Sequence, residues 1–460
     1  MKDASRKQTW NPSQFNEYLG DLSKDNWVIY NNLSGAMIEI ERELYDAVLS
    51  RQLESLSKPE HIRDLTHGKI IVPVETDEVE ALRKVKGQHI KDVTAIGLQI
   101  LPCVSCNFSC PYCYQQPHGQ PRLMSQEVMD AIIDHLEKKA APTTRFLSVM
   151  WYGGEPLLAI DRIQYLSHRF LEIVQAHNLK YFGAMISNGY LLTKKNIGIL
   201  LENKITFCQV TVDGPEHIHD SRRMLKNGGK TWRTIIDNVK QAVSADMKVT
   251  IRMNIDKVTI DTVEEFVEAL RAHDLLNRVG VSFGLVTIYG NACRSIEDTL
   301  LTLPTANSLL EKKNIKALLN KKKEKVKRAM PDFIGCVATA RHSVIVGPEG
   351  ELYKCSKNVG DKNEQCGTIF QFDELQPNFR KWEDCNNFGL KLCRRCSMLP
   401  ICHGTGCAFD CIIKKENIFD CDKKEKHKKH IQRLISIYLQ NKHSNAKNKN
   451  QKKEETNEGD

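Results

Sequence analysis

The stretch of sequence that decides the fold runs from Cys106 to Tyr114 and reads Cys-Asn-Phe-Ser-Cys-Pro-Tyr-Cys-Tyr. Its three cysteines have the spacing C-x3-C-x2-C and directly follow an apolar, strand-like segment; they are Cys106, Cys110 and Cys113. Three thiolates can bind three corners of a cubic iron–sulfur cluster. The fourth iron then has no ligand from this run and is open to a small molecule. The spacing therefore predicts a catalytic site rather than a structural one.

The composition of the chain agrees with a metal site. There are 16 cysteines in 460 residues, and the N-terminus lacks the apolar core of a signal peptide. No stretch approaches the roughly 18 apolar residues that a membrane span needs. We therefore expect a cytoplasmic protein, in which clustered cysteines stay reduced and serve as metal ligands.

The net charge does not by itself indicate a partner. The formal charge is +9, but much of the excess lies in residues 312–328 and 423–453. Runs of this kind are typical of solvated faces or tails. A nucleic acid is therefore not the expected partner, although the lysine excess keeps a nucleic-acid-modifying enzyme as an alternative. Because no membrane span is expected, a membrane is not an expected partner either.

Residues 94–310 alternate between strand-like and helical patterns. The expected strands are residues 95–102, 146–152, 181–187, 206–212, 248–255 and 279–288, and the expected helices include residues 126–139, 160–176, 194–202, 231–245 and 262–273. This alternation predicts an α/β fold with a parallel sheet. The repeats suggest a partial (β/α)6 TIM-like barrel, with a doubly wound sheet as the alternative. In both, function lies at the C-terminal ends of the strands, where the cysteine run begins.

Four segments flank this predicted barrel. Residues 1–93 are expected to form a small α+β domain with a β-hairpin over residues 27–40. Residues 311–335 form a basic helical linker, and residues 336–422 are rich in cysteine and poor in helix, so we expect them to fold around metal. Residues 423–460 begin as a basic helix and end as a disordered tail.

The run Cys106–Tyr114 resembles the signature of the radical S-adenosylmethionine (SAM) superfamily. Three further matches follow the second, third and fourth expected strands: Gly153-Gly154-Glu155-Pro156, Ser187-Asn188-Gly189, and Thr211–Pro215 with His219–Arg222. The resemblance implies a SAM-binding 4Fe–4S cluster on the three cysteines. It also implies SAM contacts from Tyr112, Gly153, Gly154, Glu155, Ser187, Asn188, Asp213 and Arg222. Read alone, these motifs would be turns, caps or a local salt bridge.

The second group of cysteines resembles the SPASM extension, whose members hold two auxiliary 4Fe–4S clusters. The resemblance implies one cluster on Cys393, Cys396, Cys402 and Cys421, and another on Cys336, Cys355 and Cys407. Four residues separate Cys402 from Cys407 where the family pattern has three, so Cys411 competes with Cys407. Cys366 and Cys385 are candidates for the missing fourth ligand, and an iron left open to substrate is the alternative. Zinc ribbons are the alternative, because C-x2-C pairs also bind zinc.

The resemblance also implies a function. SPASM relatives mostly modify peptides or proteins, so we expect a peptide or protein substrate, with or without a leader peptide, and a reductase or flavodoxin-type electron donor. One subclass installs thioether or carbon–carbon crosslinks in ribosomal peptides, and another oxidises sulfatases to formylglycine. The second usually has Asp directly after the cysteine equivalent to Cys355, where this chain has Ser356.

The N-terminal segment favours the first subclass, because residues 1–93 resemble the winged-helix element that binds leader peptides. We therefore expect a peptide- or protein-modifying oxidoreductase, with sulfatase maturation as the alternative. A non-catalytic iron–sulfur electron-transfer protein is a third reading. It would leave Gly153–Pro156 and Ser187–Gly189 unexplained.

Overall fold

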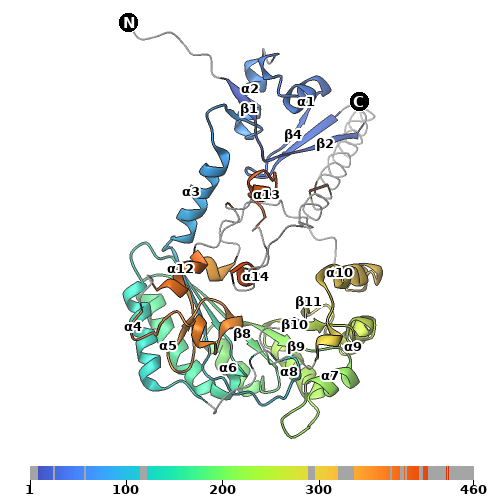
Figure 1. The fold of residues 1–460 in the computed structure, drawn as a ribbon. Coiled ribbons are helices and arrows are strands. Elements are labelled where there is room, and N and C mark those ends of the chain that lie inside the picture. The colour runs from blue at the N-terminus through green and yellow to red at the C-terminus, as the bar shows by residue number, and fades with distance from the viewer. Residues whose placement is uncertain are drawn as a thin grey trace, which may run out of the picture. The chain divides into compact units, whose positions relative to one another are not determined.

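The computed structural model divides the chain into two compact units, each built from segments that are far apart in the sequence. The first contains Met1–Lys91, Glu324–Thr339 and Asp384–Asp460, and the second contains Asp92–Lys323 and Ala340–Glu383 (Figure 1). The structure describes residues 9–23, 26–55, 58–113, 115, 122–287, 296–319, 336–372, 376–383, 388, 391–402, 408–412, 431–432 and 434. The domain boundaries drawn from the sequence stay predictions, and the expected helix and tail beyond residue 423 lie largely outside the described residues.

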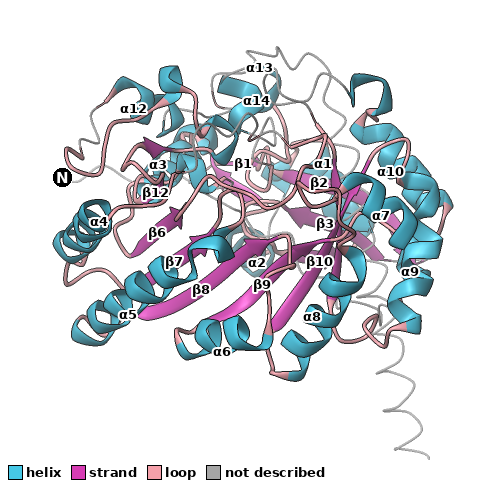
Figure 2. Cartoon of the chain, turned by 90° about the horizontal axis from the view of Figure 1, so that it is seen from below, coloured by secondary structure: helices cyan, strands magenta, loops and turns pink. Residues whose placement is uncertain are grey.

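The second unit is built on an eight-stranded sheet with the order β11-β10-β9-β8-β7-β6-β12-β13. Strands β6 to β11 are parallel neighbours in chain order: Ala95–Ile100, Phe146–Trp151, Lys180–Ser187, Ile205–Thr211, Lys248–Ile255 and Gly280–Leu285. The order of these described strands does not reverse, as it would in a doubly wound sheet. The expected partial TIM-like barrel is therefore confirmed (Figure 2).

Amphipathic helices follow these strands along the chain and cover the outer side of the sheet (Figure 2). They are α4 (Gln126–Lys139), α5 (Ile160–Ala176), α6 (Lys194–Glu202), α8 (Trp232–Ser244) and α9 (Val263–Ala272). The Ser125 side chain caps α4 and the Thr193 side chain caps α6, each by accepting a backbone N–H of the first turn. The short helix α7 (Glu216–Arg222), after β9, was not expected from the sequence. Helices α10 (Leu303–Lys312) and α11 (Ile315–Leu318) follow β11.

Two strands from the Cys-rich part of the chain extend this sheet. β12 (Ser343–Val346) pairs with β6 in parallel, and β13 (Leu352–Tyr353) pairs with β12 antiparallel. The side chain of Ser343 lies directly against β6, because a Cβ on Gly97 would come within 2.6 Å of its Oγ. The 3-10 turns Ser356–Asn358 and Lys362–Glu364 and helix α12 (Pro377–Glu383) follow in the same unit.

The first unit contains a three-stranded antiparallel sheet of β2 (Asn16–Ser23), β3 (Asn26–Asn31) and β4 (Met37–Ile40). The pairing of β3 with β4 confirms the predicted hairpin, whereas β2 was missed because its sequence is polar and contains glycine. The remaining elements are β1 (Trp10–Pro12), β5 (Ile71–Pro73), α1 (Arg42–Leu49), the 3-10 turn Leu53–Ser55, α2 (Pro59–His67), α3 (Glu78–Ile90), the 3-10 turn Val337–Thr339, α13 (Lys391–Arg394) and α14 (Ala408–Ile412).

The segment around α13 belongs to the core of this first unit. Met398 and Ile401 pack against Val28 and Tyr30 of β3. Leu399 packs against a second group that contains Phe15, Val79 and Leu82. In the part of the chain that the structure describes, no helix is both long and apolar enough to cross a lipid bilayer.

Candidate active site

A cavity of about 440 Å³ lies at the C-terminal ends of the barrel strands. Its walls are the three thiols of residues 106–113, here called the cluster loop, and side chains near the ends of β6 to β11. A volume of this size is typical of small-molecule sites, which span about 300–1,000 Å³. The cavity lies at the edge of the sheet where the sequence placed the function.

The cluster loop brings its three cysteines to one cavity. Cys110 is buried and Cys106 and Cys113 are partly exposed. Burial raises the pKa of Cys106 and of Cys110 to about 11. Among the described residues, no three His, Cys, Asp or Glu side chains converge on a point where one metal ion could bind. A cubic cluster does not require the three thiolates to converge on one point, because each thiolate binds a different iron. The donor set therefore fits three corners of a 4Fe–4S cluster.

Gly153 and Gly154, which also line the cavity, pack against the backbone that leads into the cluster loop. A Cβ on Gly153 would lie 2.3 Å from the carbonyl oxygen of Cys103, and one on Gly154 would lie 2.1 Å from that of Ser105. Gly153 also has φ +131°, a conformation that other residues rarely adopt. The two glycines are therefore required by close packing of two loops, a reason that the sequence alone did not give.

Glu155 is completely buried and does not line the cavity. Its carboxylate accepts hydrogen bonds from the Leu157 N–H (3.1 Å), the Ser187 hydroxyl (2.9 Å) and the Asn188 N–H (2.7 Å). Burial raises its pKa to about 7, although these donors act in the opposite direction. Glu155 thus connects the glycine turn after β7 to the end of β8. The contact with an amino group expected from the sequence stays a prediction.

Ser187 and Asn188 line the cavity at the end of β8. The Asn188 amide Nδ2 donates to Asn107 Oδ1 of the cluster loop at 2.7 Å and lies 3.9 Å from the Cys106 sulfur. The Ser187 hydroxyl accepts from the Gly189 N–H at 2.9 Å while donating to Glu155. The structure therefore joins two sequence motifs that lie about 80 residues apart, as the separations of these bonded pairs show.

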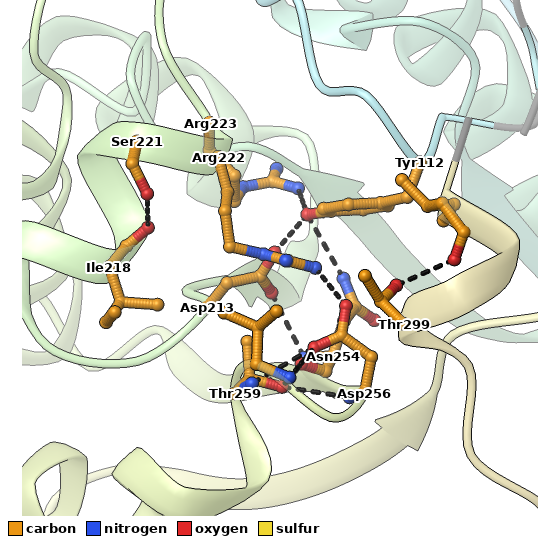
Figure 3. Close-up of polar contacts among 12 residues, drawn as sticks. Tyr112, Asp213, Ile218, Ser221, Arg222, Arg223, Asn254, Asp256, Thr259 and Thr299 are labelled. Atoms are coloured by element: carbon orange, nitrogen blue, oxygen red, sulfur yellow. Dashed lines mark hydrogen bonds and ion pairs between the residues drawn. The ribbon is translucent and has the colours of Figure 1, made fainter.

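Tyr112 lines the cavity, and its hydroxyl belongs to a buried polar network (Figure 3). Its hydroxyl hydrogen-bonds to the Asp213 carboxylate and accepts from Arg223 Nη1 at 2.5 Å and Asn254 Nδ2 at 3.4 Å. The Arg222 guanidinium faces its ring, 5.2 Å from the ring centre. Asp213 and Arg222, both predicted SAM contacts, lie behind Tyr112 and do not line the cavity.

The arginine that does line the cavity is Arg223, which sequence reasoning missed. Arg222 donates to Asp256 Oδ2 at 2.6 Å, whereas the guanidinium of Arg223 lies 5.6 Å from the ring centre of Phe108. The Nε of Arg223 is buried and has no hydrogen-bond partner among the described residues. Arg222 is the last residue of α7, and Arg223 is the residue that follows the helix. The place where the helix ends therefore decides which of the two adjacent side chains faces the cavity.

Sequence reasoning also missed polar side chains on the inner face of the barrel. Gln209 and Thr211 of β9, and Arg252 and Asn254 of β10, line the cavity, as does Gln99 of β6. Inward residues of a barrel strand alternate with outward ones. Polar residues at alternate positions in the C-terminal halves of otherwise apolar strands were therefore the signal that could have found them.

The predicted auxiliary ligands are described only in part. In the second unit, Cys355 is partly exposed, and Ser356 and Lys357 after it line the cavity. Cys366 is buried, and its thiol donates to the carbonyl oxygen of Asn378 at 3.3 Å.

In the first unit, Cys336 is partly exposed. Cys393, Cys396 and Cys402 lie on successive turns of the chain. The Cys396 N–H donates to the Cys393 carbonyl oxygen at 3.0 Å, and the Cys402 N–H donates to the Met398 carbonyl oxygen at 2.8 Å. Cys385, Cys407, Cys421 and the side chain of Cys411 lie outside what the structure describes.

Comparison with curated proteins finds relatives that share part of the chain. It is 28% identical to the cysteine-type anaerobic sulfatase-maturating enzyme of Clostridium perfringens over 170 residues, which cover 35% of this chain and 43% of that protein. It is 22% identical to the radical SAM cyclopropyl synthase TigE of Paramaledivibacter caminithermalis over 260 residues, which cover 48% of this chain and 54% of that protein. The chain thus spans about half the length of these relatives.

Comparison with solved structures finds the same fold. Native anSMEcpe with bound AdoMet and Kp18Cys peptide superposes with a TM-score of 0.57 at 19% identity, over 76% of this chain and 99% of that one. A model of the radical SAM superfamily matches residues 100–289, which include the cluster loop, the glycine turn and strands β7 to β11. This match fits the cysteine spacing, the barrel and the shared cavity. Residues 100–289 therefore form a radical SAM domain, of the family that uses a 4Fe–4S cluster and SAM.

Proposed function

We propose that this radical SAM enzyme modifies a peptide after its synthesis, by installing a thioether or carbon–carbon crosslink in a ribosomal peptide. The observation that carries the proposal is the single cavity on which the three cluster-loop cysteines, the glycine turn, and Ser187 and Asn188 meet. When bound, the cluster and SAM supply a 5′-deoxyadenosyl radical that abstracts hydrogen from a substrate carbon. The protein's own residues hold, orient and shield these groups.

The cavity walls suggest how the chain would do so. Cys106, Cys110 and Cys113 would hold the cluster, and Arg223, with its unpartnered buried Nε, can hold the carboxylate of SAM. Phe108 and the Tyr112 ring supply apolar surface beside the cysteines, which helps to exclude water.

The cavity favours peptide crosslinking over sulfatase maturation. None of the described residues that line it is Asp or Glu, and Ser356 occupies the position after Cys355. A carboxylate base of the kind expected in formylglycine formation is therefore missing from these walls. Sulfatase maturation remains the alternative because of the similarity to a sulfatase-maturating enzyme. Incubation with a sulfatase-derived Cys peptide distinguishes the two, since a formylglycine product would overturn the crosslinking proposal.

The C-terminal cysteines would hold two auxiliary clusters of the SPASM type. The successive turns that carry Cys393, Cys396 and Cys402 support one of them, with Cys421 as the proposed fourth ligand. Cys336, Cys355 and Cys407 are the proposed ligands of the other. The Cys396→Ala variant should still cleave SAM but lose peptide product, because an auxiliary cluster would serve the substrate or electron transfer. An unchanged product yield would remove this role.

Residues 1–93 would bind the leader of the peptide, and a cytoplasmic flavodoxin-type reductase would supply electrons. Because Val28 and Tyr30 pack against Met398 and Ile401, removing residues 1–90 would also uncover the segment around Cys396. Leader binding is therefore better tested in the intact protein, by photo-crosslinking a labelled leader peptide and identifying the crosslinked residues. Crosslinks that all lie outside residues 1–93 would place recognition elsewhere.

The cluster test uses Cys110→Ala with Cys208→Ala as its matched control. Cys208 is a buried thiol on β9 that does not line the cavity. After anaerobic reconstitution with SAM and dithionite, the wild type and Cys208→Ala should form 5′-deoxyadenosine, and Cys110→Ala should form only background amounts. Undiminished 5′-deoxyadenosine from Cys110→Ala would overturn the proposal.

A further inference from the structure

Arg252 of β10 directs unused hydrogen-bond donors at the cavity. Its guanidinium lines the cavity, and its Nε donates to Asn254 Oδ1 at 3.1 Å. Among the described residues, Arg252 forms no ion pair, and its Nη atoms donate no hydrogen bond. A guanidinium carries five N–H donors in a planar fork. Its Nη donors therefore have no partner in the described part of the chain and are available to a ligand in the cavity.

The neighbouring strand is shaped to hold this guanidinium. A Cβ on Gly284 of β11 would lie 1.9 Å from Arg252 Nη2 and 2.2 Å from its Cζ. Gly284 has no positive φ, so its backbone conformation does not require glycine. The requirement comes from Arg252, which lies flat against the β11 backbone. The position of the arginine is therefore fixed before any ligand binds.

The charge of the cavity wall is positive around this position. Arg223, Arg252 and Lys357 line the cavity, and the described lining residues include no carboxylate. A wall whose charged side chains are all cations favours an anionic ligand, because opposite charges attract strongly in a site of low dielectric constant.

Arg252 lies apart from the cation beside the cluster loop. Asn254 donates to the Tyr112 hydroxyl, which Arg223 also contacts. Arg252 comes two residues before Asn254 on the same strand, and its Nε donates to Asn254 Oδ1 at 3.1 Å, so the Asn254 side chain lies between the Arg252 guanidinium and the Tyr112 hydroxyl. An anion bound by Arg252 would therefore be distinct from one bound by Arg223.

We propose that Arg252 binds a carboxylate, in the bidentate geometry that matches a guanidinium. This inference rests on the proposed function, because it names the chemistry of the peptide residue that enters the barrel: an Asp or Glu side chain, or a C-terminal carboxylate. The methionine carboxylate of SAM is the other source of the same chemistry. Arg223, which contacts the Tyr112 hydroxyl beside the cluster loop, is better placed for the SAM carboxylate, and this leaves Arg252 for the peptide.

Two binding measurements on the reconstituted enzyme separate these sources. The first is the dissociation constant of SAM for the wild type, Arg252→Gln and the control Arg233→Gln, whose arginine is exposed and pairs with Glu216. The second is the binding of an acid and its isosteric amide, N-acetyl-L-glutamate N-methylamide and N-acetyl-L-glutamine N-methylamide, to the SAM-loaded oxidised enzyme by saturation-transfer NMR. Neither measurement requires turnover.

We expect the wild type and Arg233→Gln to bind the acid about tenfold or more tighter than the amide, and Arg252→Gln to lose this preference while binding SAM normally. If Arg252→Gln instead weakens SAM binding about tenfold, the carboxylate belongs to SAM. Two outcomes overturn the proposal. In the first, Arg252→Gln keeps both the wild-type acid preference and the wild-type affinity for SAM. In the second, the wild type itself shows no acid preference and Arg252→Gln binds SAM normally.

A second variant tests whether the effect of Arg252→Gln comes from the lost guanidinium or from misfolding. Gly284→Ala keeps every charge but displaces the guanidinium, and it should reproduce the loss seen with Arg252→Gln. Iron content and thermal unfolding report whether each variant is intact. Formation of 5′-deoxyadenosine by the same wild-type preparation is assayed separately, so that its absence would count against the proposed function and not against the carboxylate site.

Discussion

The guanidinium of Arg222 lies 5.2 Å from the centre of the Tyr112 ring while its Nη2 donates to Asp256 Oδ2 at 2.6 Å. Arg223, the next residue, faces the ring of Phe108. Two consecutive arginines thus contact the two aromatic residues on either side of Cys110 in sequence. Backbone hydrogen bonds between Ser109 and Met224 and between Lys226 and Asn107 fix the same two segments together. These contacts fix the cluster loop to the segment that follows α7.

Arg222→Gln should destabilise the protein by about 3–5 kcal/mol, because it leaves the fully buried Asp256 carboxylate without its cation. Chemical denaturation of the apoprotein measures the loss. Adding Asp256→Asn to the variant should recover part of it, since the uncompensated charge is then gone. Arg233→Gln, at an exposed ion pair, should cost less than about 1 kcal/mol. Equal losses for Arg222→Gln and Arg233→Gln would contradict the assignment of a buried pair.

Gly154→Ala should lower the iron content after reconstitution and destabilise the fold. Its methyl group would lie 2.1 Å from the Ser105 carbonyl oxygen, so the backbone entering the cluster loop must shift. Gly198→Ala on α6 is the control, because a Cβ there meets no atom within 4 Å. Alanine in that helix should be neutral or stabilising by up to about 1 kcal/mol. Normal iron content in Gly154→Ala would show that the loop tolerates the displacement.

Glu155 should make stability fall as pH rises. Burial raises its pKa from the usual 4.5 of an exposed glutamate to about 7 in the folded protein. At a pH between these two pKa values, Glu155 keeps its proton in the folded state and releases it in the unfolded chain. Each pH unit in this window should therefore cost up to about 1.4 kcal/mol of unfolding free energy.

The Glu155→Gln variant should lose this pH dependence, because glutamine does not titrate. Unfolding free energies of the apoprotein measured from pH 5 to pH 7 provide the comparison. Parallel pH profiles for the two proteins would show that Glu155 titrates normally.

Cys366→Ser and Cys366→Ala should both keep the wild-type iron content. The Cys366 thiol is buried and donates to the Asn378 carbonyl oxygen, which satisfies it within the protein. The alanine variant should lose about 1 kcal/mol of stability, because that hydrogen bond and a small buried volume are removed. A reproducible loss of iron in both variants would instead make Cys366 the missing auxiliary ligand.

The sequence predicted the barrel well because its signals are local. Helices α4, α5 and α6 have the bounds expected from their apolar periodicity, and Ser125 and Thr193 mark the starts of α4 and α6. Strand β12 was missed because Ser343–Val346 is short and owes its structure to pairing with the distant β6. Within the site, the motifs predicted which segments meet, but not which side chains face the cavity. Arg222 and Arg223 show this, because they are the same residue type at adjacent positions and only the side chain of Arg223 lines the cavity.

The pairing of β12 with β6 has a consequence for the order of assembly. The strand that leads into Cys106 meets β7 soon after it is synthesised, but its other edge stays open until the ribosome has released Ser343–Val346, far downstream. An open strand edge invites aggregation, and multidomain chains tend to fold as they emerge. Iron delivered to a nascent chain would therefore reach the cluster loop before the sheet next to it is complete. We expect cofactor loading to follow synthesis of the C-terminal part of the protein.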